Sequence, residues 1–188
     1  NKGKTSFIST FLSKQFPNYN SPVSQTGIQM HKTTCLVDEK IVQVSIIDTK
    51  SNPSCMVQRC QWYFETNMFI LCFAMDDQQS LKSICTQWYV SHYRVNSKVA
   101  CFYRIPELLN KSPTTPYILV GLKQDLPASS NMRMSAQSIA KEYKCSSLLY
   151  ANSNDLSAVQ QCFHSMYSLK ELSVTNLSFS CRTHIKHC

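Results

Sequence analysis

The chain has 188 residues, 43% of them hydrophobic and 16% charged, which excludes wholesale disorder and fits one α/β domain with its own core. Its net charge of +8 would suit nucleic acid, an anionic membrane surface or an acidic protein. Because the lysines and arginines are scattered rather than gathered in a run, we expect no nucleic-acid partner.

In chain order, the first predicted element is a helix over the apolar stretch 7–12, directly after Gly3-Lys4-Thr5-Ser6. A β-hairpin follows at 35–47, and its second strand ends at Asp48. Because side chains at the carboxyl end of a strand face the ligand edge of an α/β sheet, Asp48 is a candidate site residue.

Two continuous apolar runs, Met68–Met75 and Tyr117–Gly121, predict buried parallel strands. Apolar residues at helical spacing predict helices at 79–89, at about 135–143 and at 155–172. Since strands alternate with helices, we expect βαβ units, a mainly parallel sheet and a ligand at the carboxyl ends of the strands.

The end of the chain, residues 173–188, shows no clear period and is predicted to be a flexible tail after a domain at 1–172. The ten cysteines include no CxxC pair, and several lie in apolar runs, so they are interpreted as small buried hydrophobic residues in a reducing compartment. No apolar run approaches the ~18 residues that a membrane-spanning helix requires, and no secretory leader is recognisable. We therefore expect a cytoplasmic protein.

Gly3, Lys4 and Thr5 carry the first recognisable chemistry. A phosphate loop needs a glycine where backbone N–H groups surround oxygen anions, a lysine for the outer phosphates, a hydroxyl for Mg²⁺ and a helix N-terminus. These residues and the helix behind them supply those parts, with Ser6 beside them. The first glycine of the complete G-x-x-x-x-G-K-[ST] motif would lie upstream of Asn1, so this is half a motif.

Further segments fall in a register that resembles the Ras superfamily, and most closely its Rho branch. Asp48-Thr49 matches the opening of the family's Asp-Thr-Ala-Gly-Gln element, and the segment Ser80–Trp88 resembles a Rho helix. Residues 115–126, which contain Lys123-x-Asp125, look like the family's strand and its Asn/Thr-Lys-x-Asp base motif. The resemblance covers roughly 3–172.

This resemblance implies the small G-protein fold of the P-loop NTPase type, a three-layer α/β sandwich with a mainly parallel sheet. The first strand is predicted to be missing, and its neighbours would be left as open edges, because that strand lies at the centre of the sheet. Compared with Rho proteins, a segment at about 92–109 is an insertion. It is interpreted as a tolerated surface loop, with a basic and aromatic partner surface as the alternative.

The resemblance also implies site roles. Lys4 would hold the β- and γ-phosphates, Thr5 would ligate Mg²⁺, and Asp48 would fix the water shell of the metal. Asp125 would accept hydrogen bonds from guanine, beside the stem of Lys123, because a carboxylate that faces two donors discriminates guanine from adenine. The bland alternatives are a strand-end cap at Asp48 and a solvated turn at 123–125.

Three further assignments are weaker. The backbone N–H of Ala151 would meet the guanine carbonyl. For the second Mg²⁺ ligand, direct counting reaches Val23, whereas a reading with small gaps reaches Thr26, which we favour. The family's Ala-Gly-Gln becomes Lys50-Ser51-Asn52, and Asn52 is one methylene too short to orient the attacking water. Leu122 replaces the Asn or Thr that tethers the base motif to the phosphate loop.

The resemblance therefore implies a monomeric, Mg²⁺-dependent switch that binds GTP and GDP in Rho- or Ras-type signalling, with slow or no hydrolysis. Effectors, an exchange factor and a GTPase-activating protein would be its partners. Its location would be the cytoplasm or the inner face of the plasma membrane, with peripheral contact only. One alternative is a pseudoGTPase scaffold that does not cycle nucleotide. Another is a truncated product that does not fold independently.

Overall fold

The structure is a computed structural model, and it describes residues 3–17, 29–37, 40–49, 63, 66–85, 105, 108–109, 112–127, 131–171 and 180–187. Its elements, in chain order, are α1 (Lys4–Ser13), β1 (Gln29–Val37), β2 (Lys40–Thr49), β3 (Met68–Ala74), α3 (Gln78–Cys85), β4 (Tyr117–Leu122), α5 (Met132–Glu142), β5 (Ser147–Ala151), α6 (Leu156–Glu171) and β6 (Ser180–His187). The strands form one sheet in the order β1-β2-β6-β3-β4-β5.

The sheet is parallel apart from the β1–β2 hairpin. The predicted hairpin is confirmed, and its first strand begins earlier than predicted, because Gln29 already pairs with Asp48. The two apolar runs are confirmed as β3 and β4, in which every side chain is buried. The pattern fits strands that are covered on both faces.

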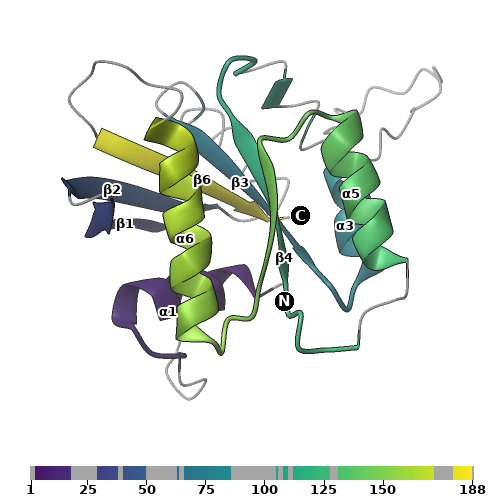
Figure 1. The fold of residues 1–188 in the computed structure, drawn as a ribbon, viewed down its shortest axis with the longest axis horizontal. Helices are drawn as coiled ribbons and strands as arrows, with labels where there is room; N and C mark the ends of the chain where they lie inside the picture. The colour runs from purple at the N-terminus through teal and green to yellow at the C-terminus, as the bar shows by residue number, and fades with distance from the viewer. Residues whose placement is uncertain are drawn as a thin grey trace, which may run out of the picture.

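Helices cover both faces of the sheet, with α1 and α6 on one side and α3 and α5 on the other (Figure 1). The side chains of β3 pack alternately into the two core layers, because successive side chains of a strand point to opposite faces. Met68, Ile70 and Cys72 join the α1/α6 core. The intervening residues, Phe69, Leu71 and Phe73, join the α3/α5 core. The three-layer arrangement is thus confirmed.

The predicted helices at 79–89, 135–143 and 155–172 correspond to α3, α5 and α6. Residues 86–89 lie outside the described part of the chain. The surface-loop interpretation of the 92–109 insertion is wrong for two of its described residues, because Ile105 and Leu108 are fully buried in the α3/α5 core. Their burial gives this end of the segment a packing role.

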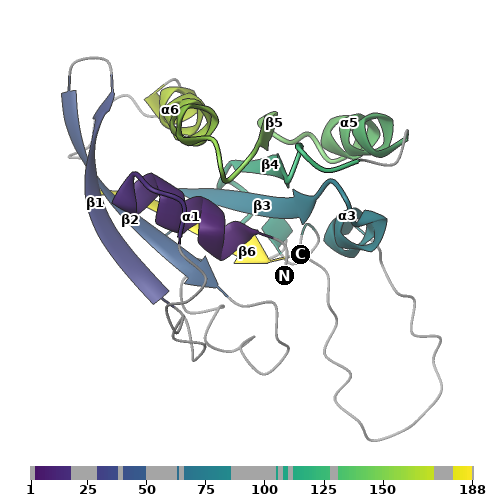
Figure 2. The ribbon, with the colours of Figure 1, turned by 90° about the horizontal axis from the view of Figure 1, so that it is seen from below.

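The centre of the sheet is occupied by β6, which the sequence analysis assigns to a flexible tail. This strand runs parallel to both of its neighbours, so that Ile47 of β2 faces His184 and Ile70 of β3 faces Ile185. The prediction of a flexible segment is therefore wrong for 180–187. The prediction of open edges is wrong as well, because both strands beside the expected gap are hydrogen bonded to β6. Figure 2 shows the yellow strand β6 between the β1–β2 hairpin and β3.

Five cysteines are free thiols: Cys35, Cys72, Cys85, Cys145 and Cys162. Cys72 and Cys162 are buried, and burial raises the pKa of the Cys162 thiol to about 12. These two behave as the predicted small hydrophobic residues, whereas Cys35, Cys85 and Cys145 are only half-buried. Among the described helices, none is long and apolar enough to cross a membrane.

Candidate functional site

The predicted site residues that the structure describes gather at one edge of the sheet. Asp48 is the penultimate residue of β2, Lys123 directly follows β4, and Ala151 ends β5. Helix α1 begins at Lys4, immediately after Gly3. Because the carboxyl ends of parallel strands lie at the same edge, these positions lie together at the edge where the sequence predicts a ligand.

Lys4, Thr5 and Asp48 are in direct contact. The ammonium of Lys4 forms an ion pair with Oδ1 of Asp48, and the two side chains are 0% and 9% exposed. The hydroxyl of Thr5 donates a hydrogen bond of 2.9 Å to Oδ2 of the same carboxylate. Two charges withdrawn from water are tolerable only when they neutralise each other, so the three side chains form one buried polar cluster.

Gly3 links this cluster to the predicted base motif. Its φ of 81° is left-handed, a conformation that glycine adopts without steric cost. A Cβ at this position would lie 3.8 Å from Cγ of Lys123 and 3.9 Å from the side chain of Leu122. The turn before α1 therefore packs against the loop after β4. Ser6, one turn into the helix, is 8% exposed.

The loop after β4 begins with a left-handed residue, Lys123, at φ 61°. Its carbonyl accepts a hydrogen bond of 3.1 Å from the N–H of Leu126, which closes a turn. The carbonyl of Leu122 accepts one of 2.8 Å from the N–H of Met75, which joins this loop to the end of β3. Asp125 lies at the exposed end of the turn. Its carboxylate is thus available at the ligand edge.

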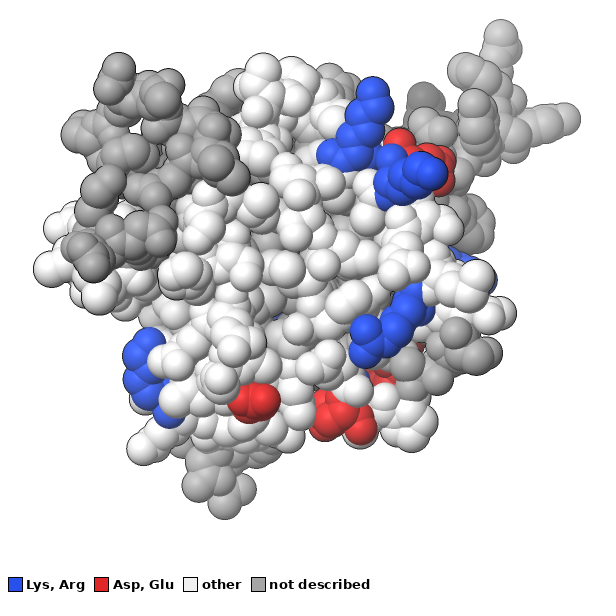
Figure 3. Space-filling view, viewed as in Figure 1, with Lys and Arg blue, Asp and Glu red and all other residues white. Residues whose placement is uncertain are grey.

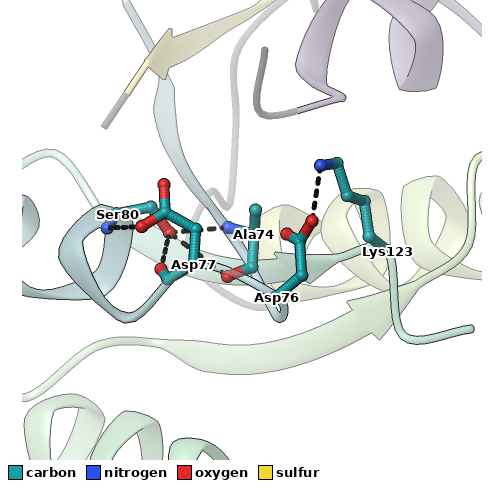
Figure 4. Close-up of polar contacts among 5 residues, drawn as sticks. All are labelled: Ala74, Asp76, Asp77, Ser80 and Lys123. Carbon is teal, nitrogen blue, oxygen red and sulfur yellow. Dashed lines mark hydrogen bonds and ion pairs between the residues drawn. The ribbon is translucent and has the colours of Figure 1, made fainter. Parts of the chain in front are cut away.

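The ammonium of Lys123 forms an ion pair of 2.8 Å with Oδ2 of Asp76, in the turn after β3 (Figure 4). The two side chains are 31% and 29% exposed. No sequence motif singles out Asp76. A carboxylate directly after a buried strand is the signal that could have found it, as it did at Asp48.

At the end of β5, Ala151 is fully buried and faces Leu122 of the neighbouring strand. The next residue, Asn152, accepts a hydrogen bond of 3.0 Å from the N–H of Asn154. Ser153 is 7% exposed, its carbonyl accepts a hydrogen bond of 2.9 Å from Thr10 of α1, and its hydroxyl has no partner among the described residues. Ser153 is a polar residue of this corner that the sequence analysis missed.

The candidates for the second Mg²⁺ ligand and the water-orienting segment lie outside the described part of the chain: Val23, Thr26 and Lys50-Ser51-Asn52. The geometry of the second Mg²⁺ ligand and of the water-orienting position therefore stays a prediction.

The positive charge of Lys4 in the buried cluster also affects His31, on β1. Partial burial lowers the pKa of its imidazole, and the positive charge of Lys4 lowers it further. Elsewhere, the face in Figure 3 shows lysine and arginine side chains in separate places rather than in a continuous patch. Strong positive potential on this face is thus local, as the scattered sequence pattern predicts.

Comparisons with known proteins agree with the resemblance. Residues 1–171 match the sequence model of the Ras family. The chain is 31% identical over 124 residues to the GTP-binding protein rho2 of Schizosaccharomyces pombe, covering 66% of this chain and 52% of rho2. It is 27% identical over 124 residues to the GTP-binding protein rho3 of the same organism, covering 66% of this chain and 51% of rho3.

A third relative is the GTP-binding protein rhoC of Emericella nidulans, 31% identical over 130 residues, which cover 66% of this chain and 38% of rhoC. The chain spans about half the length, or less, of these curated relatives. The family match extends over nearly all of the elements described above, and the matching relatives are Rho-type proteins. The chain therefore belongs to the Ras family, as a divergent member that resembles the Rho proteins.

Proposed function

We propose that this chain binds guanine nucleotide together with Mg²⁺ and acts as a Rho-type molecular switch with weak or no intrinsic hydrolysis. The buried cluster of Lys4, Thr5 and Asp48 is the observation that carries the proposal. It brings a cation for phosphate and two oxygen-bearing side chains for a metal to the N-terminus of α1. Its setting is a Ras-family chain whose relatives are named GTP-binding proteins.

The chemistry of these donors fits the expected ligand. Hydroxyl and carboxylate oxygens are the ligands that Mg²⁺ prefers, and Mg²⁺ with a helix N-terminus would neutralise the charge of the phosphates. Lys4 would exchange Asp48 for phosphate oxygens, while Thr5, with Thr26 as predicted, would hold the metal and Asp48 would fix its water shell. Because each partner of the ion pair then receives a new opposite charge, the proposal requires nucleotide and Mg²⁺ to bind cooperatively.

The base would be read at the neighbouring corner. Asp125 is exposed at the loop end, where its carboxylate can accept hydrogen bonds from guanine. The stem of Lys123, which lies beside Gly3, would flank the base. The N–H of Ala151 is the predicted donor to the guanine carbonyl.

A titration with mant-GTP, in the presence and absence of Mg²⁺, tests this function. The wild type is expected to bind with micromolar or tighter affinity when Mg²⁺ is present, and Lys4→Ala to lose binding. Lys14→Ala is the matched control, because Lys14 is exposed at the other end of α1. No binding by a wild-type protein that unfolds cooperatively would refute the proposal, as would equal losses in both variants.

The hydrolysis part of the proposal rests on Asn52, which is one methylene shorter than the family's glutamine. A single-turnover assay should therefore show little release of phosphate over the time in which ordinary family members complete their reaction. Asn52→Gln should raise the rate if side-chain length alone limits it. A wild-type rate comparable to that of ordinary members would contradict slow turnover.

A pseudoGTPase scaffold is the second candidate, and one observation favours it. The ammonium of Lys4 is fully buried against Asp48, so the phosphate-binding cation already has an opposite charge. A scaffold would bind protein partners through its surface and would show no Mg²⁺-dependent nucleotide binding in the titration. As a switch, the chain would meet effectors, an exchange factor and a GTPase-activating protein in the cytoplasm or at the inner face of the plasma membrane.

A further inference from the structure

We propose that Asp76 is a positioning residue for the base-reading loop, and that it sets the preference for guanine over adenine by holding Lys123. This inference rests on the proposed function, because it concerns the same site. It adds a residue outside the expected motifs and gives that residue a defined action.

The first step is the conformation of Lys123. A left-handed backbone is unfavourable for any residue with a Cβ, yet Lys123 adopts φ 61° directly after β4. Such a conformation persists when the surroundings determine it from several directions. The turn to Leu126 fixes the main chain, and the packing beside Gly3 fixes the side-chain stem. Among the described residues, Asp76 is the only polar partner of the ammonium.

The turn that carries Asp76, the partner of Lys123, is held by several hydrogen bonds. Asp76 lies in a turn whose flanks are tied by Ser80, a side chain that is fully buried. The Ser80 hydroxyl accepts a hydrogen bond of 2.9 Å from the N–H of Ala74 and donates one of 2.6 Å to the carbonyl of Asp77. The N–H of Ser80 donates in turn to the Asp77 carboxylate at 3.1 Å (Figure 4). Asp76 is therefore presented from a preorganised turn.

The polar tether that the family has at the end of β4 is absent from this chain. Leu122, where the family has an Asn or Thr tether, is fully buried in the apolar α1/α6 core. Its side chain offers no hydrogen bond toward the turn at Gly3. The ion pair at Lys123 thus supplies a polar link between the loop and the rest of the ligand edge, from β3 rather than from the phosphate loop. Asp125 lies only two residues further along, so its orientation depends on the same anchor.

The experiment compares Asp76→Asn with Asp77→Asn. Both variants remove one negative charge from the same turn, and asparagine at 77 retains the capping of α3. For an ion pair this exposed, Asp76→Asn should reduce the mant-GTP over mant-ATP affinity ratio about two- to fivefold, and 0.5 M NaCl should diminish the effect. Asp77→Asn should leave the ratio unchanged. Equal reductions in the two variants would overturn the proposal.

A second comparison asks whether Asp76 acts through Lys123. In a Lys123→Met background, Asp76→Asn should have no further effect on the affinity ratio, because the link is already absent. A reduction of the same size in that background would show that Asp76 acts through something else, and the proposal would fail. Thermal unfolding of every variant reports whether the fold is retained.

The two proposals can fail separately. If the wild type binds no nucleotide, the proposed function fails, and the anchoring action of Asp76 is then measured by hydrogen exchange at the Leu126 amide, which is bonded to the carbonyl of Lys123. Faster exchange in Asp76→Asn, but not in Asp77→Asn, is expected for a loop that has lost its anchor. Unchanged exchange would overturn the anchoring role as well.

Discussion

Two lysine–aspartate ion pairs stand at the same edge of the sheet, and they differ in how much water reaches them. Lys4 and Asp48 are 0% and 9% exposed, whereas Lys123 and Asp76 are 31% and 29% exposed. The first pair lies where phosphate and metal are proposed to bind, and the second where the base is proposed to bind. Their chemistry is the same, so the contrast isolates the effect of burial.

Burial changes what each pair can do. In the dry corner, removal of one partner leaves an uncompensated charge, so the cluster can open only when other charges replace both partners. In the wet corner, water and salt screen the pair, which then contributes little energy and mainly orients a loop. The proposed phosphate corner is thus suited to coupled binding of an anion and a cation, and the proposed base corner to orienting a loop.

The largest expected effect comes from breaking the dry pair. Lys4→Met should lower the free energy of unfolding by about 3–5 kcal/mol, because Asp48 would stay buried without its counter-charge. Adding Asp48→Leu should restore most of the loss, since no unpaired charge then remains. Urea denaturation measures both. A double variant as unstable as the single one would show that the pair has little to do with the stability of this corner.

Packing beneath the base corner should produce the next effect. A Cβ on Gly121 would lie 2.6 Å from Cδ1 of Tyr150 and 2.9 Å from Cζ of Phe73. Gly121→Ala should therefore cost about 1–3 kcal/mol through overpacking, again measured with urea. In a Tyr150→Leu background the cost should be smaller because the closest ring is absent. An equal cost in both backgrounds would argue against this contact as the cause.

Breaking the wet pair should matter much less for stability. Lys123→Met should change the free energy of unfolding by no more than about 1 kcal/mol, because both side chains are partly solvated. Measured beside Lys4→Met under identical conditions, it tests the contrast directly. Similar losses in the two variants would mean that burial does not distinguish the pairs.

The smallest effect concerns pH at the dry corner. The lowered pKa of His31, caused by burial and then by Lys4, means that the folded state binds the proton less readily than the unfolded state, whose pKa is near 6.5. The contribution of His31 to stability should be complete above pH 6.5 and fall as the pH drops below it. His31→Gln should flatten this part of the stability profile. Parallel profiles for the two proteins would contradict the assignment.

Much of the fold could be predicted, because strands covered on both faces carry a local signature. The apolar runs of β3 and β4 are such strands. β6 was missed because its sequence, from Ser180 to His187, holds basic and polar residues instead of an apolar run. Its place depends on pairing with distant strands, which no local pattern encodes. β5, with only five residues that are mostly half-buried, gives too short a signal.

The site divides in the same way. Lys4, Thr5 and Asp48 could be predicted because each follows from residue type and from its place at a helix start or a strand end, and the structure brings them together. Asp76 could not be paired with Lys123 from sequence, because the contact depends on a left-handed backbone that residue type does not foretell for lysine. Ser153 was overlooked because its burial arises from contact with α1.

The position of β6 affects how the sheet can form while the chain is being synthesised. Of the described strands, β6 is the one that joins the hairpin to β3, β4 and β5 in one sheet. Residues 180–187 leave the ribosome long after those strands. Until then the facing edges of β2 and β3 lack β6 as a hydrogen-bonding partner. Such distant parallel pairing is slow. We therefore expect the nascent chain to depend on chaperones until β6 has been synthesised.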